Sequence, residues 1–358
     1  MPAASTAVFV GVDTHADTHH VAVIDQLGRH LGDREFPADP DGYRSLLDWI
    51  SSIGSVAGVG VEGTGTYGAQ LGRVLTAAGL AVLEVNRPDR ATRRANGKSD
   101  PVDAYAAAQA VASGRADSVP KSRDGIVESI RCLRVARRSA VKAKTQCINQ
   151  IRGLLITGPM DLREHMKPLG TVALIQALSR LRPGTDLSAP AAAIRLTLRS
   201  LARRHLALND EIKELDIVLD ELTTTAAPGL LAKTGVGTEV AGQLLVSAGD
   251  NPERLRSEAS FAHLAGVAPI PASSGRTNRH RLNRGGDRAA NKALHTVAVV
   301  RLKYDERTRA YARRRTAEGL SKKDIMRCLK RAIAREIYQE LTRPTRFTPT
   351  PEDPAVSP

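Results

Sequence analysis

Apolar residues recur in short runs near the N-terminus, in the pattern of strands that bury one or both faces. Runs at 7–12, 20–24 and 30–36 predict three strands. The turn residues Asp25 to Gly28 predict an antiparallel hairpin between the last two. The chain is therefore expected to begin with three strands in succession.

The pattern then changes to helices alternating with strands. Apolar residues at helical spacing predict a helix over 41–50, and a second predicted helix over 67–78 ends at Gly79. Strands are predicted up to Glu62 and over 81–85. The order strand, strand, strand, helix, strand, helix, strand is that of the ribonuclease H-like nuclease fold, so we predict an α/β domain.

Helical periodicity dominates the middle of the chain. An Ala-rich helix is predicted over 103–112, and after a break at 117–124 a long helix follows over 126–155. A second long helix, joined to it by region 158–190, has apolar residues at alternating spacings of four and three, the seam of a coiled coil. The seam residues are Ile194, Leu198, Leu201, His205, Leu208, Ile212, Leu215, Leu219 and Leu222.

Two roles follow for this part of the chain. His205 is expected to pack in the seam or set its register rather than bind a metal. The two long helices are expected to form an antiparallel arm or an oligomerisation element.

A mostly helical C-terminal domain is predicted after residue 228. The turn around Gly235 and Gly237, followed by a helix over 240–247, is similar to a helix-hairpin-helix element, whose backbone N–H groups can face a phosphate. An ordinary turn between helices is the alternative. Residues 343–358 are rich in proline and are expected to be a disordered tail.

The charge of the chain indicates a polyanionic partner. The net charge is +14, and residues 276–335 contain 19 Lys or Arg against 5 Asp or Glu. Such a surface binds phosphate backbones through counterion release, whereas an aromatic content of 3% argues against base stacking as the main contact. The candidate nucleic-acid-binding side chains are Arg131, Arg134, Arg138, Lys142, Arg276, Arg279, Arg281, Arg284 and Arg288. For those on the long helix, a merely solvated charged face is the alternative.

Cysteine usage and hydropathy indicate where the protein works. Cys132, Cys147 and Cys328 are widely spaced and odd in number, so neither a disulfide framework nor a zinc motif is expected. The sequence shows no signal peptide and no apolar run long enough to span a membrane. We expect a cytoplasmic, nucleoid-associated protein with reduced thiols.

Four carboxylates are the candidate catalytic groups. Asp13 and Glu62 end apolar runs that would be neighbouring strands, and Asp100 and Asp103 share one face of a helix start. Three or four acids with no Cys or His suit two Mg²⁺ ions, with Mn²⁺ as a substitute, in phosphodiester cleavage.

Two alternatives compete with this interpretation. Asp100, followed by Pro101, could be only the N-cap of its helix. His15, His19 and His20 could suggest zinc, but no fitting fourth ligand is near, and we expect polar residues at an edge close to the site.

At these residues the sequence resembles the IS110 family of insertion-sequence transposases. The matching segments are 11–15, 61–68, 85–88, 97–104, 264–269, 273–275 and 283–287, which together sample nearly the whole chain. The resemblance implies a RuvC-like domain over 1–115 with an Asp-Glu-Asp-Asp tetrad at Asp13, Glu62, Asp100 and Asp103. It further implies linker and coiled-coil helices over 116–226 and a transposase domain with a nucleophilic serine over 227–342.

The same resemblance implies partners. Family members are guided by an element-encoded bridge RNA that pairs with target and donor DNA. They assemble as tetramers in which the serine of one subunit completes the metal site of another. Ala16, where relatives often carry Lys, is a departure that leaves the tetrad intact.

The nucleophile is expected to be Ser274, because the family pattern centres on the serine directly before glycine, with Ser273 as the second candidate. No His or Lys forms an obvious local partner for either, so metals bound by the other domain would activate the hydroxyl. The alternative is that both serines only shape a polar turn.

The sequence therefore predicts an RNA-guided DNA recombinase that excises and inserts its own element. A metal-dependent nuclease of Holliday-junction type and a site-specific DNA invertase are the alternative enzymes. A basic nucleic-acid-binding scaffold is the non-enzyme alternative.

Overall fold

The computed structural model describes residues 7–85, 99–276 and 280–343. Arg279, the C-terminal tail and the motif residues at 86–88 and 97–98 lie outside the described residues. The chain divides into two compact units, one comprising Met1–Arg123 with Asn251–Arg256, the other Asp124–Asp250 with Ser257–Pro358.

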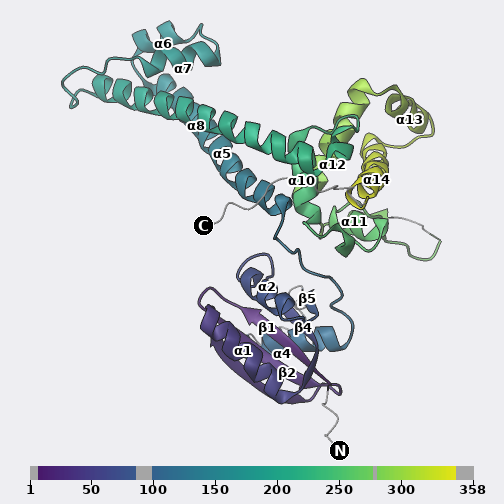
Figure 1. The fold of residues 1–358 in the computed structure, drawn as a ribbon. Helices are drawn as coiled ribbons and strands as arrows, with labels where there is room; N and C mark the ends of the chain where they lie inside the picture. The colour runs from purple at the N-terminus through teal and green to yellow at the C-terminus, as the bar shows by residue number, and fades with distance from the viewer. Residues whose placement is uncertain (1–6, 86–98, 277–279, 344–358) are drawn as a thin grey trace, which may run out of the picture. The chain divides into compact units, whose positions relative to one another are not determined.

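The first unit is built on a five-stranded mixed sheet in the order β3-β2-β1-β4-β5 (Figure 1). The first three strands pair antiparallel, whereas β4 and β5 run parallel to β1. The strands are β1 (Ala7–Thr14), β2 (Thr18–Asp25), β3 (His30–Pro37), β4 (Ser55–Glu62) and β5 (Val82–Val85). The predicted element order is thus confirmed, but β1 runs through Asp13 instead of ending at it.

The helices on one face of the sheet pack against it through their apolar stripes. Helix α1 (Pro40–Ile53) is capped by Asp39, whose side chain accepts a hydrogen bond from the Gly42 N–H. Tyr43, Leu46 and Ile50 of this helix are buried in one core with alternate residues of the sheet. Helix α2 (Ala69–Ala77) starts two residues later than predicted, and α4 (Asp100–Ala112) starts earlier.

The second unit contains the two long helices, α5 (Ile126–Thr157) and α8 (Pro190–Ala226). Lys144 of α5 binds Asn209 of α8, whereas Arg137, earlier in α5, binds Asp216, later in α8. The two helices are therefore antiparallel, as predicted. Every predicted seam residue of α8 is buried or half-buried. Region 158–190 contains two helices that the sequence analysis did not predict, α6 (Met160–Met166) and α7 (Thr171–Ser179), which share a core with α5 and α8.

The remaining elements of this unit are short helices and one small hairpin. Helices α10, α12 and α14 pack in series, and α11 packs on α14 (Figure 1). The elements are α9 (Pro228–Leu231), α10 (Thr238–Ala248), α11 (Glu258–Leu264), β6 (Ile270–Pro271), β7 (His280–Arg281), α12 (Arg288–Tyr304), α13 (Glu306–Ala317) and α14 (Lys322–Leu341). The short 3-10 helix η1 (Pro252–Arg254) belongs to the first unit.

Candidate functional site

Strand alternation places two of the candidate carboxylates on one face of the sheet. Val8, Val10 and Val12 of β1 belong to the core beneath α1 and α2, so Asp13 lies on the opposite face. The same alternation applies to Glu62 of β4, because Val59 and Val61 belong to that core. Val12 pairs with Val61 between the parallel strands, which makes Asp13 and Glu62 neighbours, as the sequence analysis expected.

Helix α4 covers this face at very short range. A Cβ built on Gly11 of β1 would lie 2.0 Å from the Ala104 carbonyl oxygen, and one on Gly60 would lie 2.8 Å from the Ala107 carbonyl oxygen. Two strand glycines and an Ala-rich helix therefore allow backbone to approach backbone. This close packing carries the first turn of α4 to Asp13 of β1.

The first turn of α4 supplies the other two carboxylates. The N-cap is Ser99, whose carbonyl oxygen accepts the first helical hydrogen bond from the Asp103 N–H. The alternative interpretation of Asp100 as the cap is therefore wrong, and Asp100 and Asp103 both belong to the first turn. The positive end of the helix dipole favours carboxylates at this position.

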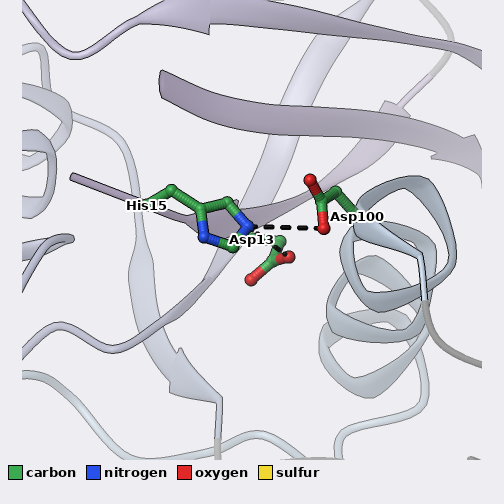
Figure 2. A group of neighbouring side chains, drawn as sticks. All are labelled: Asp13, His15 and Asp100. Atoms are coloured by element: carbon green, nitrogen blue, oxygen red, sulfur yellow. Dashed lines mark ion pairs between the residues drawn. The ribbon is translucent and has the colours of Figure 1, made fainter. Parts of the chain in front are cut away.

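Asp13, His15 and Asp100 form a group that could hold a metal ion (Figure 2). Their ligand atoms lie within 4.8 Å of one another. The His15 Nε2 is 3.3 Å from Asp13 Oδ2 and 3.4 Å from Asp100 Oδ1. Burial raises the pKa of the Asp13 carboxyl; the His15 ring opposes the shift, whereas Asp103 and Asp100 add to it. Three carboxylates therefore act on one another electrostatically, and a cation would relieve their repulsion.

The histidines differ from the expectation of polar residues at an edge. Strand β2, which carries His19 and His20, lies inside the sheet between β3 and β1. His19 is fully buried and stacks on Tyr43, and burial lowers its pKa. His15 belongs to the group that could hold a metal ion. His15 lies one residue beyond the end of β1 and two residues from Asp13, and this spacing was the available signal.

The loop after Glu62 explains the glycines of that segment. Gly63 has φ +71°, a conformation that side chains rarely adopt, and Thr14 Oγ1 donates a hydrogen bond of 2.8 Å to the Glu62 carbonyl oxygen. A Cβ on Gly68 would lie 2.9 Å from Val61 Cγ1. The loop thus folds back tightly on the ends of β1 and β4 and holds the half-buried Glu62 in place.

A second polar network flanks the carboxylates and was missed by the sequence analysis. His20 pairs with Asp13 in the sheet register, and its Nε2 lies 2.8 Å from Asp33 Oδ2. The Tyr105 hydroxyl of α4 donates a hydrogen bond of 3.1 Å to Asp33 Oδ1. Burial and this carboxylate raise the pKa of Tyr105 to about 12. The network ties α4 to β2 and β3, and its members are brought together by the sheet register and by the packing of α4 on the sheet.

The two candidate serines lie in the second unit. Ser273 and Ser274 follow β6, and both are exposed. Gly275 has φ +54°, so the glycine after Ser274 is required by the backbone. Part of the family-like segment 283–287 has a structural role. Asp287 caps α12, because its Oδ1 accepts hydrogen bonds from the Ala289 and Ala290 N–H groups.

The predicted nucleic-acid-binding residues of α5 separate into two groups. Arg131 binds Glu128, and Arg134 binds Glu239 and Gln243 of α10, so both side chains hold the fold together. Arg138 and Lys142 are exposed, and within the described ranges no ion pair occupies them. These two remain available for a phosphate backbone.

Further candidates lie near the C-terminus. Gly235 has φ +81° and packs on α12, where a Cβ would lie 3.3 Å from the Val297 carbonyl oxygen, whereas Gly237 has open space around it. The backbone conformation and close packing of Gly235 therefore explain the glycine at this position, and no phosphate ligand is needed to explain it. The exposed arginines of this region are Arg276, Arg281, Arg284 and Arg288.

Comparison with known proteins places the chain in a family. Residues 10–157 match the model of the IS110 DEDD transposases, and residues 229–313 match the model described as transposase IS116/IS110/IS902 family. The two matches together span more than half of the chain. The chain belongs to the IS110 transposase family. This IS110-family transposase is thus an enzyme of DNA transposition.

Individual relatives cover most of this IS110-family transposase. The "Mini-circle putative transposase for IS117" of Streptomyces coelicolor is 26% identical over 76% of this chain and 78% of its own length. The IS900 42 kDa protein of Mycobacterium paratuberculosis is 26% identical over 87% of this chain and 90% of its own. The IS110 43.6 kDa protein of S. coelicolor is 25% identical over 87% and 88%. In the part of the transposase that the structure describes, no helix is long and apolar enough to cross a membrane.

Proposed function

We propose that this transposase cuts and rejoins DNA with a RuvC-like carboxylate site in the first unit and a serine nucleophile in the second. The sheet order and the meeting of Asp13 and Asp100 over its α4 face support the RuvC-like assignment over residues 1–115. The tetrad would be completed by Glu62 and Asp103. Residues 116–226 would be the linker and coiled-coil arm, and 227–342 the transposase domain.

The chemistry of the donor set fits a divalent cation. Asp13 is buried beside two further carboxylates, and oxygen ligands on rigid elements are those that Mg²⁺ prefers. Asp13, Glu62, Asp100 and Asp103 would hold Mg²⁺ or Mn²⁺, and the nitrogen of His15 is a ligand that Mn²⁺ accepts more readily. When bound, the ions would supply charge neutralisation at the scissile phosphate and lower the pKa of an attacking hydroxyl.

The nucleophile in this proposal is the Ser274 hydroxyl, with Ser273 as the alternative. Its oxygen would form a bond to phosphorus while one phosphodiester P–O bond breaks, and the proton lost by serine would balance the proton gained by the departing oxygen. The resulting phosphoserine bond conserves the energy needed for rejoining. The exposure of both serines on a hairpin supports access to DNA.

Guidance by a bridge RNA and assembly as a dimer or tetramer are part of the proposal. Family membership and a net charge of +14 support a second polyanion besides DNA. The RNA would pair with target and donor DNA and thereby select the sites that the protein joins.

A covalent-adduct assay tests the mechanism. The protein is incubated with element-end DNA, Mg²⁺ and the flanking noncoding transcript, and a protein-DNA adduct is sought by denaturing electrophoresis. We expect the adduct to disappear in Ser274→Ala and Asp13→Asn and to persist in Ser139→Ala, an exposed serine of α5. Cleavage that survives Ser274→Ala and Ser273→Ala would favour the nuclease that uses water, and binding without any cleavage would contradict the catalytic site.

A further inference from the structure

A cavity of about 560 Å³ lies within the second unit, at the base of the hairpin that carries the serines. Its walls are the segment before β6, strand β7 with the residues after it, and one face of α14. The volume is that of a site for a small organic ligand. A phosphate alone would not need a cavity of this size.

One wall of the cavity is apolar. Val267, Pro269 and Leu282 line it, and Leu282 is 48% exposed. Gly266 and Gly286 fix this wall, because a Cβ on Gly286 would lie 2.3 Å from the Gly266 nitrogen. The wall thus offers apolar side chains against which the base of a ligand can pack.

The facing wall is basic. Arg327, Arg331 and Arg335 recur every fourth residue along α14, so they share one face of the helix, and Lys330 lies beside them. Arg281 adds a further cation from β7. Among the described residues that line the cavity, the only carboxylate is Asp324, which pairs with Arg327, and Glu258 pairs with Arg331 and Arg335 from outside the lining. Such a surplus of positive charge suits an anionic ligand.

Lys330 carries a positive charge without a counter-ion. Its Nζ binds Asn291 Oδ1 at 2.8 Å, and the Asn291 Nδ2 donates to the Ala265 and Gly266 carbonyl oxygens. Burial lowers the pKa of Lys330, and Arg327 lowers it further. Among the described residues no carboxylate forms an ion pair with it. A phosphate would supply the missing charge.

The cavity lies close to the serines along the hairpin. Pro271 pairs with His280 of the cavity wall, and Ser273 follows Pro271 by two residues. Two extended residues span at most about 7 Å. A strand whose phosphodiester is attacked at this hairpin would therefore pass within a few nucleotides of the cavity.

We propose that the cavity seats one nucleotide of the DNA strand that the serine attacks, with its base on the apolar wall and its phosphate on the α14 row. The inference rests on the proposed function, because the serine identifies the strand. It assigns a binding role to α14, which the sequence analysis did not single out. An apolar wall can take the base of a nucleotide, and a cationic row can take its phosphate.

The chain carries its own probe of occupancy. Cys328 lines the cavity, Cys147 is 2% exposed, and Cys132 lies on the surface of α5. In a Cys132→Ser background, the rate at which N-ethylmaleimide modifies Cys328 is measured by mass spectrometry. The probe is a mixed-sequence single-stranded DNA decamer, added without divalent metal. We expect the DNA to slow the modification of Cys328 severalfold.

A matched pair of double variants tests the phosphate row. Arg327 and Arg335 have side chains 45% and 64% exposed and pair with acids, and Arg309 and Arg313 of α13 match them at 45% and 65% without lining the cavity. We expect R327Q/R335Q to weaken DNA binding about tenfold. Its salt dependence should fall by about 1.4 in the slope of log K against log salt concentration. R309Q/R313Q should change neither quantity as much.

Several results would overturn the proposal. These are binding of DNA without protection of Cys328, equal protection by an abasic decamer, protection by an RNA decamer but not by DNA, and equal effects of the two double variants. Absence of DNA binding would also overturn it. The two proposals can fail separately. An adduct formed while DNA leaves Cys328 unprotected would support the serine mechanism and contradict the nucleotide site. Protection of Cys328 without an adduct would support the nucleotide site and contradict the serine mechanism.

Discussion

Asp13 has the most demanding environment of the candidate catalytic residues. Its carboxyl is buried on the α4 face of the sheet, and two further carboxylates raise its pKa in addition to the effect of burial. His15 partly offsets this repulsion. A residue kept in such surroundings destabilises the metal-free protein, and its retention is consistent with a role in binding a cation.

The sign of this effect leads to a stability prediction for Asp13→Asn. The pKa of Asp13 in the folded state lies above its ordinary value of 3.8. Between these two pKa values the folded state binds more protons than the unfolded state, so the stability of the protein falls as the pH rises through this range. In EDTA at pH 7 the variant should therefore melt at a higher temperature than wild type. The advantage should shrink as the pH is lowered towards 3.8.

Metal should reverse the order of the two proteins. At a Mn²⁺ or Mg²⁺ concentration of about 100 Kd, wild type should gain about 2.7 kcal/mol and the variant much less. Differential scanning fluorimetry with and without metal measures both effects. A variant that is less stable than wild type in EDTA would contradict the account of Asp13.

At the scale of elements, the decisive contact is that of α4 with the sheet. Helix α4 is rich in alanine and has little amphipathic character, yet it packs closely because Gly11 and Gly60 leave room for its backbone. The close approach carries Asp100 and Asp103 to Asp13. The geometry of the site thus depends on residues that have no chemistry of their own.

Gly11→Ala should therefore impair both fold and site. The new Cβ would lie 2.0 Å from a backbone oxygen of α4, so the helix must shift, at a cost of about 1–3 kcal/mol. The matched control is Gly72→Ala in α2, where nothing lies within 4 Å and alanine should be neutral or stabilising by up to about 1 kcal/mol. Urea unfolding measures both, and equal stability of the two variants would contradict the close approach.

A second element-scale prediction concerns the start of α5. Its N-cap is Gly125, which offers no side chain, and Asp250 accepts instead from the Val127 and Glu128 N–H groups. Asp250→Ala should cost about 1 kcal/mol, because it removes the acceptor for these groups. Asp250→Asn keeps an oxygen and should cost less. Chemical denaturation that finds alanine and asparagine equivalent would rule out a capping role.

At the scale of the whole molecule, the candidate groups are divided between the two units. The carboxylates lie in the first, and Ser273 and Ser274 in the second. Under the proposed mechanism one subunit can supply the metal site and another the serine. The long helices α5 and α8 provide an extended surface for such an assembly.

A mixing experiment tests this division. Asp13→Asn and Ser274→Ala are each expected to form no adduct. When the two variants are co-expressed in equal amounts and pair at random, about half of the dimers are mixed, and each mixed dimer has one of its two composite sites intact. The mixture should therefore form roughly a quarter of the wild-type adduct. No recovery in a mixture shown to contain mixed oligomers would mean that each subunit uses its own serine.

The sequence by itself determined the succession of strands and helices along the first unit, the inward-facing seam of α8 and the positions of the four acids along the chain, because side-chain periodicity and turn residues are local properties. It did not reveal that Asp100 lies inside its helix, that His15 joins the metal-binding group or that His19 is buried. Those depend on sheet register and on the approach of α4 at Gly11, which link residues far apart in the chain. The division between Arg134, bound to Glu239, and the exposed Arg138 was likewise decided by tertiary packing, since charge alone does not tell a structural arginine from a free one.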